Sequence, residues 1–326
     1  MPNFISYPIK FFPIFKENVW GGKNLKNILN KNLPKNKNIG ESWEISTVKN
    51  NVSVISNGKY KSLPLLELVR KYPVELLGYK YKNHKEFPLL YKFLDASENL
   101  SVQTHPDNIS SGNNKSLCGK SECWHIINTS NNKIILGVNE KFNLNKIKKL
   151  IKSNDFDSVL NYRKIKNGDT IYVPAGTVHA VLKGTLIAEI QQPSDITYRF
   201  FDWNRNLPER PLQIGQCLKS IKKTRFKNLT PAPKVILKND NFEITRLLKN
   251  KLFNINLAVF QNECILENLK DSFRILSNIS RDCKIRFSSG KKTYGFRKGE
   301  TVLIPAAVSG NLILNSSGQT RILDIS

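Results

Sequence analysis

The stretch Gly168-Asp-Thr-Ile-Tyr-Val-Pro-Ala-Gly-Thr-Val-His179 (GDTIYVPAGTVH) predicts the fold of this 326-residue chain more directly than any other segment. Its threonine, isoleucine, tyrosine and valine favour an extended strand. Pro174 and Gly176 then predict a tight turn, because proline fixes one backbone angle and glycine accepts conformations closed to other residues. The stretch therefore predicts two strands joined by a tight turn, the second of which carries His179 inward.

The same pattern recurs at a constant offset of 131 residues, in Gly299-Glu-Thr-Val-Leu-Ile-Pro-Ala-Ala-Val-Ser-Gly310. A glycine, an acidic residue, threonine, three apolar positions, proline and alanine match in order. Such a repeat predicts two copies of one β-barrel. Glycine stands in the second copy where the first has His179. If that histidine carries chemistry, only the first copy is expected to be active.

The rest of the chain supports a mainly β fold. Short segments rich in β-branched and aromatic residues, bounded by turn residues, predict strands over 86–95, 99–105, 122–128, 133–139, 169–174, 179–192 and 196–203. Helical patterns are fewer and cover the segment after Ser62, residues 144–152 and residues 211–221. Many short strands with few helices predict a β-sandwich or a jelly roll. Together with the repeat, we expect two jelly-roll β-barrels with a few short helices.

The proline-punctuated segment TPAPK (230–234) predicts a linker between domains. Strand patterns resume after it and continue to the end. We expect a catalytic, metal-binding domain over residues 1–229 and a second barrel without metal ligands over residues 230–326.

A second short pattern, SVQTHPDN (101–108), suggests a metal site. Gln103 and His105 are two residues apart, so on a strand both side chains point to the same face. Glu122, in GKSECWH, offers a carboxylate. Taken singly, Gln103 is more often a surface residue, His105 can cap a turn, and Glu122 can pair with a lysine. Together with His179 they form a nitrogen and oxygen donor set that suits Zn²⁺, with Fe²⁺, Mn²⁺ or Co²⁺ as alternatives.

The two patterns resemble the two motifs of the cupin superfamily of metal-binding jelly rolls. The stretch ending at His179 matches the second motif. The first motif has two ligands two residues apart and a later glutamate, and here glutamine takes the place of its first histidine at position 103. Of the remaining histidines, we expect His84 to lie in a loop and His125 to be structural or to lie behind the ligands.

Longer blocks resemble the type I mannose-6-phosphate isomerase (phosphomannose isomerase) family in its short bacterial form. The blocks are VWGG (19–22), GESWEIS (40–46), FPLLYKFLDASENLSVQTHPDN (87–108), GKSECWHII (119–127), YVPAGTVHAV (172–181) and EIQQPSDITYRFFDW (189–203). They occur in the expected order within about residues 7–225. The part after residue 230 is matched only by its cupin-like repeat.

The resemblance implies an enzyme that interconverts mannose 6-phosphate and fructose 6-phosphate through a cis-enediol, with one Zn²⁺ per chain. The metal ligands of the family correspond to Gln103, His105, Glu122 and His179. Its active-site lysine corresponds to Lys120, its catalytic arginine to Arg199, and a serine near the substrate to Ser101.

Several assignments stay open at this stage. The proton-transferring base is Glu189, Lys120 or Asp202, because one sequence does not fix a pKa. Lys92 interrupts the apolar strand PLLYKFLD and is either a solvated lysine or a cleft residue that points toward phosphate. Two other functions compete with the isomerase: a different metal-dependent cupin enzyme such as an oxygenase, and a sugar-binding cupin module.

The composition limits the partners and the compartment. The formal net charge is +25, but lysines are dispersed through loops together with asparagines, which favours compositional drift over a nucleic-acid surface. Five cysteines without a CxxC pair favour a reducing cytoplasm. No run of 18 apolar residues and no signal-like start are found, so no membrane span is expected. The expected partner is a small phosphosugar, without nucleic acid, membrane or obligate protein partner.

Overall fold

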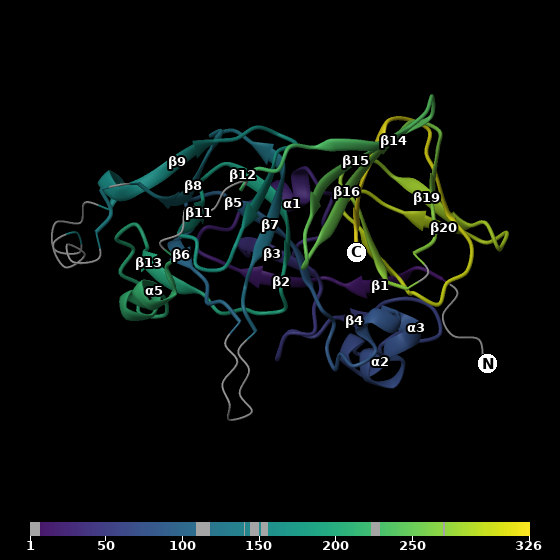
Figure 1. Cartoon of the computed structure of the whole chain (residues 1–326), viewed down its shortest axis with the longest axis horizontal. Helices are drawn as coiled ribbons and strands as arrows, with labels where there is room; N and C mark the ends of the chain where they lie inside the picture. Colours follow the sequence, from purple (N-terminus) through teal and green to yellow (C-terminus); the bar gives the residue numbers. More distant parts are fainter. Residues whose placement is uncertain are drawn as a thin grey trace.

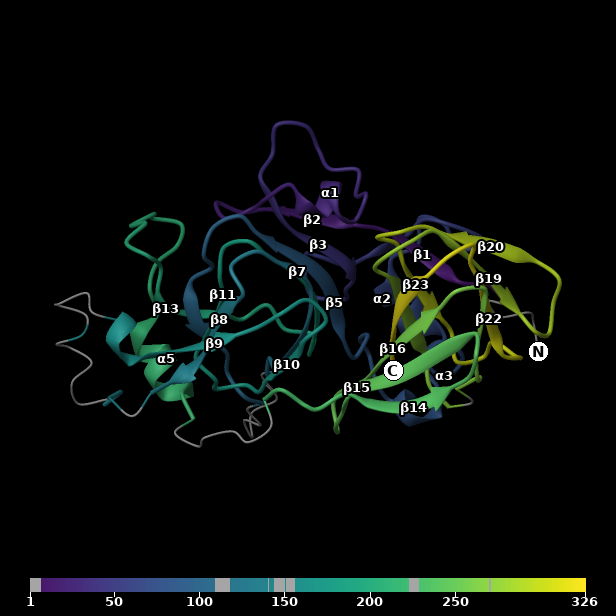
Figure 2. The same cartoon turned by 90° about the horizontal axis from the view of Figure 1, so that it is seen from above.

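The computed structural model describes residues 7–108, 118–139, 141–143, 150, 156–222, 229–269 and 271–326. Antiparallel strands dominate, and they form two barrels that lie side by side along the long axis of the molecule (Figure 1 and Figure 2). The prediction of a mainly β protein with two jelly-roll barrels is confirmed.

The first barrel packs a six-stranded sheet, in the order β10-β7-β12-β5-β3-β2, against a five-stranded sheet, in the order β13-β6-β11-β8-β9. The bounds of the six strands are β2 Ile14–Glu17, β3 Ile39–Ile45, β5 Leu90–Ala96, β7 Glu122–Thr129, β10 Thr170–Val173 and β12 Thr185–Gln191. The other five are β6 Val102–Thr104, β8 Lys133–Val138, β9 Leu160–Lys164, β11 His179–Val181 and β13 Tyr198–Phe201. Buried side chains such as Trp124 and Ile187 from one sheet and Ile134 and Val181 from the other share one apolar cluster.

The second barrel packs an eight-stranded sheet, β14-β15-β16-β23-β18-β21-β1-β4, against the four-stranded sheet β17-β22-β19-β20. The bounds in the larger sheet are β1 Ile9–Phe12, β4 Val54–Ile55, β14 Lys234–Lys238, β15 Phe242–Lys249, β16 Asn254–Phe260, β18 Arg274–Asn278, β21 Thr301–Ile304 and β23 Thr320–Ile325. Those in the smaller sheet are β17 Glu263–Leu266, β19 Cys283–Phe287, β20 Thr293–Phe296 and β22 Leu312–Asn315.

The repeated sequence forms the same element in both barrels. Strand β10 covers residues 170–173 and strand β21 covers residues 301–304, which preserves the offset of 131 residues. After β10, Gly176 adopts a φ of +85°, and a Cβ atom there would lie 2.7 Å from the carbonyl oxygen of Ser220. Only glycine fits this turn without strain, and the turn is what delivers His179 to the start of β11.

The two barrels share a core. Strands β1 and β4 come from the start of the chain but pair into the sheet of the second barrel, where Ile9 lies opposite Leu303. The hydroxyl of Tyr91, on β5, donates a 2.7 Å hydrogen bond to the hydroxyl of Ser277, on β18. The division of the chain near residue 230 stays a prediction, and these contacts tie the two parts together.

Helices are short and lie outside the sheets. Helices α2 (Leu65–Lys71) and α5 (Ile214–Ser220) fall on two predicted segments, and α1 (Asn24–Asn27), α3 (Pro73–Leu77) and the 3-10 helices η1 (Tyr79–Tyr81) and η3 (Asp157–Val159) are additional. The helix predicted over 144–152 lies outside the described residues apart from Leu150. In the described part of the chain, no helix has the length and apolar character needed to cross a membrane.

One strand prediction is wrong. Residues 179–192 form two strands, β11 and β12, rather than one. Gly184, between them, has a φ of +82°, so the chain turns there instead of continuing.

Candidate metal centre and substrate cleft

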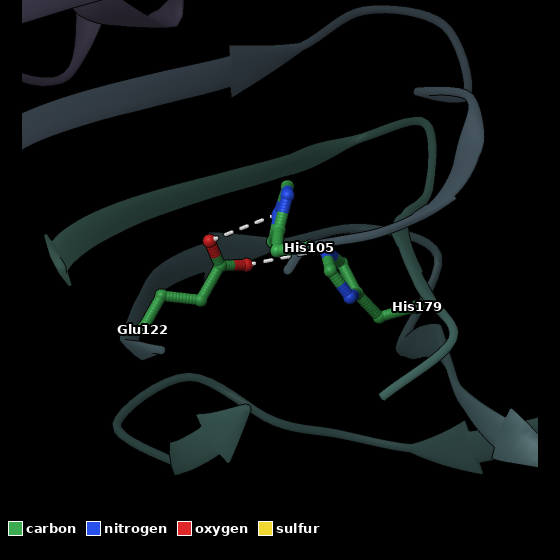
Figure 3. A group of neighbouring side chains, drawn as sticks. All are labelled: His105, Glu122 and His179. Carbon is green, nitrogen blue, oxygen red and sulfur yellow. Dashed lines mark ion pairs between the residues drawn. The ribbon is translucent and has the colours of Figure 1, made fainter. Parts of the chain in front are cut away.

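Three side chains converge inside the first barrel (Figure 3). His105 directly follows β6, Glu122 begins β7, and His179 begins β11. The distance from His105 Nε2 to Glu122 Oε2 is 3.4 Å, and that from His179 Nε2 to Glu122 Oε1 is 3.2 Å. All three residues are almost fully buried. The first motif, the later glutamate and the turn after β10 therefore meet at one point, as the sequence predicts.

The backbone fixes the orientation of both imidazole rings. The Nδ1 atom of His105 lies 2.9 Å from the carbonyl oxygen of Ile196, and the Nδ1 atom of His179 lies 2.9 Å from that of Thr177. A carbonyl oxygen only accepts, so each Nδ1 carries the proton and donates it. Each Nε2 then presents a lone pair toward Glu122, which is the arrangement that metal-binding histidines require.

The electrostatics also favour ligand forms of these groups. Burial, together with the charge of Lys120, lowers the pKa of His105 to about 3, and burial lowers the pKa of His179. Burial alone would raise the pKa of Glu122, but Lys120 and the two histidines hold it well below its usual range. Two neutral imidazoles and one carboxylate are therefore available at neutral pH.

These residues fit a divalent metal ion such as Zn²⁺. Their candidate ligand atoms all lie within 4.8 Å of one another. The Oε2 atom of Glu122 is buried and has no hydrogen-bond partner among the described residues. The Lys120 ammonium lies 3.5 Å from this oxygen, and a buried carboxylate oxygen without a hydrogen bond is costly, which favours a closer cation. Imidazole nitrogen and carboxylate oxygen are common zinc ligands.

Gln103 lies beside this group. It faces His179 across the paired strands β6 and β11, and its amide nitrogen is 3.4 Å from His179 Nε2. Its amide oxygen accepts a 3.2 Å hydrogen bond from the hydroxyl of Ser101. Rotation of the amide by 180° would exchange the nitrogen and the oxygen, which are assigned from the hydrogen-bond network.

A polar cleft of about 360 Å³ opens beside these side chains. Its lining includes the predicted site residues Lys92, Ser101, Gln103, Lys120, Glu122 and Arg199, together with Glu189. The structure thus brings the candidate substrate and catalytic residues into one cleft, except for Asp202, one of the three candidate bases. Of the other histidines, neither the exposed His84 nor the buried His125, whose Nδ1 is 3.2 Å from Thr170 Oγ1, lines this cleft.

Lys92 is a buried cleft residue held between two carboxylates. Its Nζ atom lies 3.5 Å from an oxygen of Glu41 and 3.5 Å from an oxygen of Glu189. Burial would lower the pKa of the Lys92 ammonium, but Glu189 and Glu41 raise it above its ordinary value. Lys92 is thus a buried cleft residue and not a solvated one, whereas its predicted contact with phosphate stays a prediction.

Glu189 and Asp202, two of the candidate bases, have different surroundings. Glu189 is buried and lines the cleft, and burial, reinforced by the negative charge of Glu122, raises its pKa to about 8. Asp202 is held by Arg205 at 3.0 Å and by Arg210 at 2.8 Å, and it is absent from the cleft lining within the described residues.

Sequence reasoning missed three prominent cleft residues. Glu41 and Trp43 lie two apart on β3 and face the cleft, and Arg210 reaches it from the segment before α5. The block GESWEIS could have predicted the first two as cleft residues, because their spacing puts them on one face of a strand. Arg210 carries no such signal, since its position depends on how a loop returns to the barrel.

A cupin-type barrel with a buried His–Glu–His group beside a polar cleft defines a metal-binding enzyme of the cupin superfamily. Residues 9–131 match the family model of the phosphomannose isomerase type I catalytic domain. The mannose-6-phosphate isomerase of Streptococcus mutans is 34% identical over 295 residues, which cover 89% of this chain and 90% of that protein. The chain therefore belongs to the type I mannose-6-phosphate isomerase family, and the predicted resemblance is confirmed.

Solved structures agree with this assignment. The crystal structure of the mannose 6-phosphate isomerase from Bacillus subtilis superposes with a TM-score of 0.87 at 30% identity, covering 98% of this chain and 99% of that one. A zinc-bound mannose 6-phosphate isomerase shares the fold with a TM-score of 0.75 at 17% identity, with coverage of 98% and 99%.

Proposed function

We propose that this enzyme is a zinc-dependent aldose–ketose isomerase that interconverts mannose 6-phosphate and fructose 6-phosphate. The observation that carries the proposal is the His105–Glu122–His179 group, which adjoins a cleft lined by both cationic and acidic buried side chains. Family membership supports the substrate, and the donor chemistry supports the metal.

Four residues would hold one Zn²⁺ per chain: His105, Glu122 and His179, joined by the amide oxygen of Gln103. When bound, the ion supplies fixed positive charge that stabilises negative charge developing on the sugar oxygens. The hydroxyl of Ser101 would then hold the rotated Gln103 amide, since a hydroxyl both donates and accepts hydrogen bonds.

Lys120 acts close to the reacting carbons. Its Nζ atom is 3.1 Å from His105 Nε2 and 3.5 Å from Glu122 Oε2, and it also lines the cleft. An ammonium in this place lies next to the oxygens at C1 and C2 of a sugar bound beside the metal ligands. It donates hydrogen bonds to these oxygens and stabilises the enediolate in a buried, low-dielectric site.

Glu189 moves the proton between the two carbons. Its carboxylate takes the proton from C2 of mannose 6-phosphate, which gives the cis-enediol, and returns it to C1 while a hydroxyl proton shifts from O2 to O1. Glu189 is the best placed of the three candidate bases, because Asp202 is engaged by two arginines outside the cleft and Lys120 is held against the ligand group. A pKa raised to about 8 brings this carboxyl close to the operating range of a general base.

Lys92 orients Glu189 and does not bind the phosphate. Its ammonium is engaged by Glu41 on one side and by Glu189 on the other, at 3.5 Å each. Arg199, in contrast, lines the cleft next to Gln103, which it faces across strands β13 and β6. Its guanidinium is available for substrate oxygens.

The two-domain division is part of the same proposal. The first barrel carries the catalysis, and the barrel formed mostly after residue 230 has a structural role.

We also place the enzyme in the cytoplasm: the five cysteines are free, and four of them are buried.

A coupled assay for fructose 6-phosphate tests the function directly. Purified enzyme is given mannose 6-phosphate before and after treatment with a chelator, and again after addition of Zn²⁺. We expect product formation that is lost with the chelator and restored by zinc. Absence of product in the zinc-loaded enzyme would refute the proposed reaction, and oxygen consumption with stoichiometric iron would indicate an oxygenase instead.

A further inference from the structure

The geometry points to Arg199 and Arg210 as a paired guanidinium clamp for the phosphate group of the substrate, with Asp202 orienting Arg210. This inference rests on the proposed function and extends it, because it assigns the subsite that distinguishes a phosphorylated sugar from a free one.

Arg210 is held in one orientation. Its Nε and Nη2 atoms donate to the two carboxylate oxygens of Asp202, at 2.8 Å and 2.9 Å. Asp202 is buried, and it accepts a separate 3.0 Å hydrogen bond from Arg205 Nη1 in addition to its two bonds with Arg210. This paired contact uses one edge of the Arg210 guanidinium. The Arg210 side chain also lines the cleft. A guanidinium fixed in this way presents its remaining N–H groups to a ligand at little entropic cost.

Arg199 lies next to Arg210 because the backbone joins their segments. The amide N–H of Arg199 donates to the side chain of Gln213 at 2.8 Å, and the amide N–H of Gln213 donates back to the carbonyl oxygen of Arg199 at 2.9 Å. Strand β13 is thereby attached to the residues that directly follow Arg210. Both guanidinium-bearing side chains line the same cleft.

The Arg199 guanidinium lacks an anionic partner within the described part of the chain. It makes no ion pair there, and its buried Nε atom has no hydrogen-bond partner. Asp202 is already engaged by Arg210 and Arg205, and Asp195, which also lines the cleft, is exposed. Two adjacent guanidiniums with a shortage of carboxylates favour binding of a dianion, and planar forks match phosphate oxygens in pairs.

The other cations of the cleft are committed elsewhere. Lys92 is paired with two carboxylates, and Lys120 lies against the metal-ligand group. Lys16 donates to the side chain of Asn51 and lies over the ring of Trp43. The phosphate end of the cleft is therefore the arginine pair, and the sugar carbons extend from it toward Lys120 and the metal ligands.

The test compares Arg210→Gln with Arg205→Gln in the zinc-loaded enzyme. Arg205 contacts the same carboxylate but does not line the cleft, so it is a matched control. We expect Arg210→Gln to raise the KM for mannose 6-phosphate by roughly 10- to 100-fold, the usual loss for a charge-assisted contact. Calorimetric binding of ethyl phosphate, a phosphate monoester without a sugar, should weaken to a similar degree. Arg205→Gln should change both by less than about 3-fold.

Zinc content and thermal midpoint establish that each variant is folded, and Arg210→Lys, which keeps the charge but not the fork, should fall between wild type and Arg210→Gln. An unchanged KM and unchanged ethyl phosphate binding in Arg210→Gln would overturn the clamp while leaving the isomerase intact. Conversely, Arg210-dependent binding of ethyl phosphate in an enzyme that forms no fructose 6-phosphate would support the clamp and refute the proposed reaction.

Discussion

The two barrels of this protein share one pattern of strand pairing but place side chains of opposite charge at the same buried position. In the first, β7 pairs with β10 so that Glu122 lies opposite Val173, and in the second, β18 pairs with β21 so that Arg274 lies opposite Ile304. Val173 and Ile304 are equivalent in the repeat. A buried arginine therefore takes the place of the buried glutamate at the metal site.

The difference extends to the neighbouring strand. Glu189 lies opposite Trp124, two residues after Glu122, and Asp324 lies opposite Leu276, two residues after Arg274. Asp324 therefore takes the place of Glu189. The Nε atom of Arg274 is 2.8 Å from the carboxylate of Asp324, and both side chains are buried.

The second barrel thus neutralises its buried charge within one ion pair, whereas in the first the carboxylate of Glu122 adjoins two imidazoles in a group that fits a metal ion. The space differs accordingly. Beside Arg274 and Gly310 the cavity measures about 10 Å³, about enough for one water molecule, against about 360 Å³ for the cleft of the first barrel. In the second copy an internal ion pair takes the positions that Glu122 and Glu189 have in the first.

The largest effect is expected where the copies differ by a ligand, at His179. We predict that His179→Ala, like His105→Ala, loses bound zinc and lowers kcat/KM by roughly 1,000-fold or more, because the remaining ligands no longer complete the site. Metal analysis and the coupled assay measure both quantities. His84→Ala, which removes an exposed loop histidine, is the control. Full activity in a metal-free His179→Ala variant would contradict the mechanism.

The ion pair of the second barrel should matter for stability and not for chemistry. We predict that Arg274→Met lowers the free energy of unfolding by about 3–5 kcal/mol, because the buried charge of Asp324 is left without its partner. Urea unfolding measures this loss. The zinc content should not change.

The double variant Arg274→Met/Asp324→Leu is the matched control for that experiment. Replacing a buried ion pair with apolar side chains is often neutral or stabilising, so most of the loss should be recovered. A double variant as unstable as the single one would show that the pair does not act as a unit.

Substitution of Arg199 tests a cleft cation outside the His105–Glu122–His179 group. We predict that Arg199→Lys keeps its zinc but lowers kcat/KM for mannose 6-phosphate by roughly 10- to 100-fold, because an ammonium cannot reproduce the two-pronged contact of a guanidinium. Steady-state kinetics with metal analysis check this. Equal kcat/KM values in Arg199→Lys and wild type would show that the planar guanidinium, with its paired N–H donors, is not needed at this position.

The smallest effect concerns His125, which pairs with Thr170 where the second barrel pairs Ser277 with Thr301. Burial lowers the pKa of His125 to about 4, below the ordinary 6.5. The unfolded chain therefore takes up the proton first, so the stability that neutral His125 contributes is present above pH 6.5 and is lost as the pH falls toward 4. Between pH 7 and pH 5.5 the loss is about 1 kcal/mol.

Urea unfolding of wild type and His125→Asn over this pH range measures that contribution. Asparagine does not titrate, so the variant should show a shallower decline by about that amount. Parallel declines in the two proteins would contradict the assignment.

Much of the fold and of the metal site could be predicted because it depends on local geometry. The Pro-Ala-Gly turn and its repeat predict the strands before and after it, and the spacing of Gln103 and His105 puts them on one face of a strand. The turn at Gly184 was missed, since an apolar run on both sides of one glycine also suits a longer strand.

The rest depends on strand pairing, which the sequence does not display. Glu41 reaches Lys92 only because β3 pairs with β5 in the register that sets Trp43 opposite Lys92. The Arg274–Asp324 pair joins strands that are neighbours in the sheet but distant in the chain. No periodicity within one segment reports such a contact.

The central claim is that only the first barrel holds the metal. Anomalous diffraction at the zinc absorption edge, from crystals of the zinc-loaded enzyme, tests it most directly. We predict one strong peak per chain between Glu122, His105 and His179, with the amide oxygen of Gln103 about 2.0–2.2 Å from it. A peak of equal strength beside Arg274, or none among the three ligands, would contradict it.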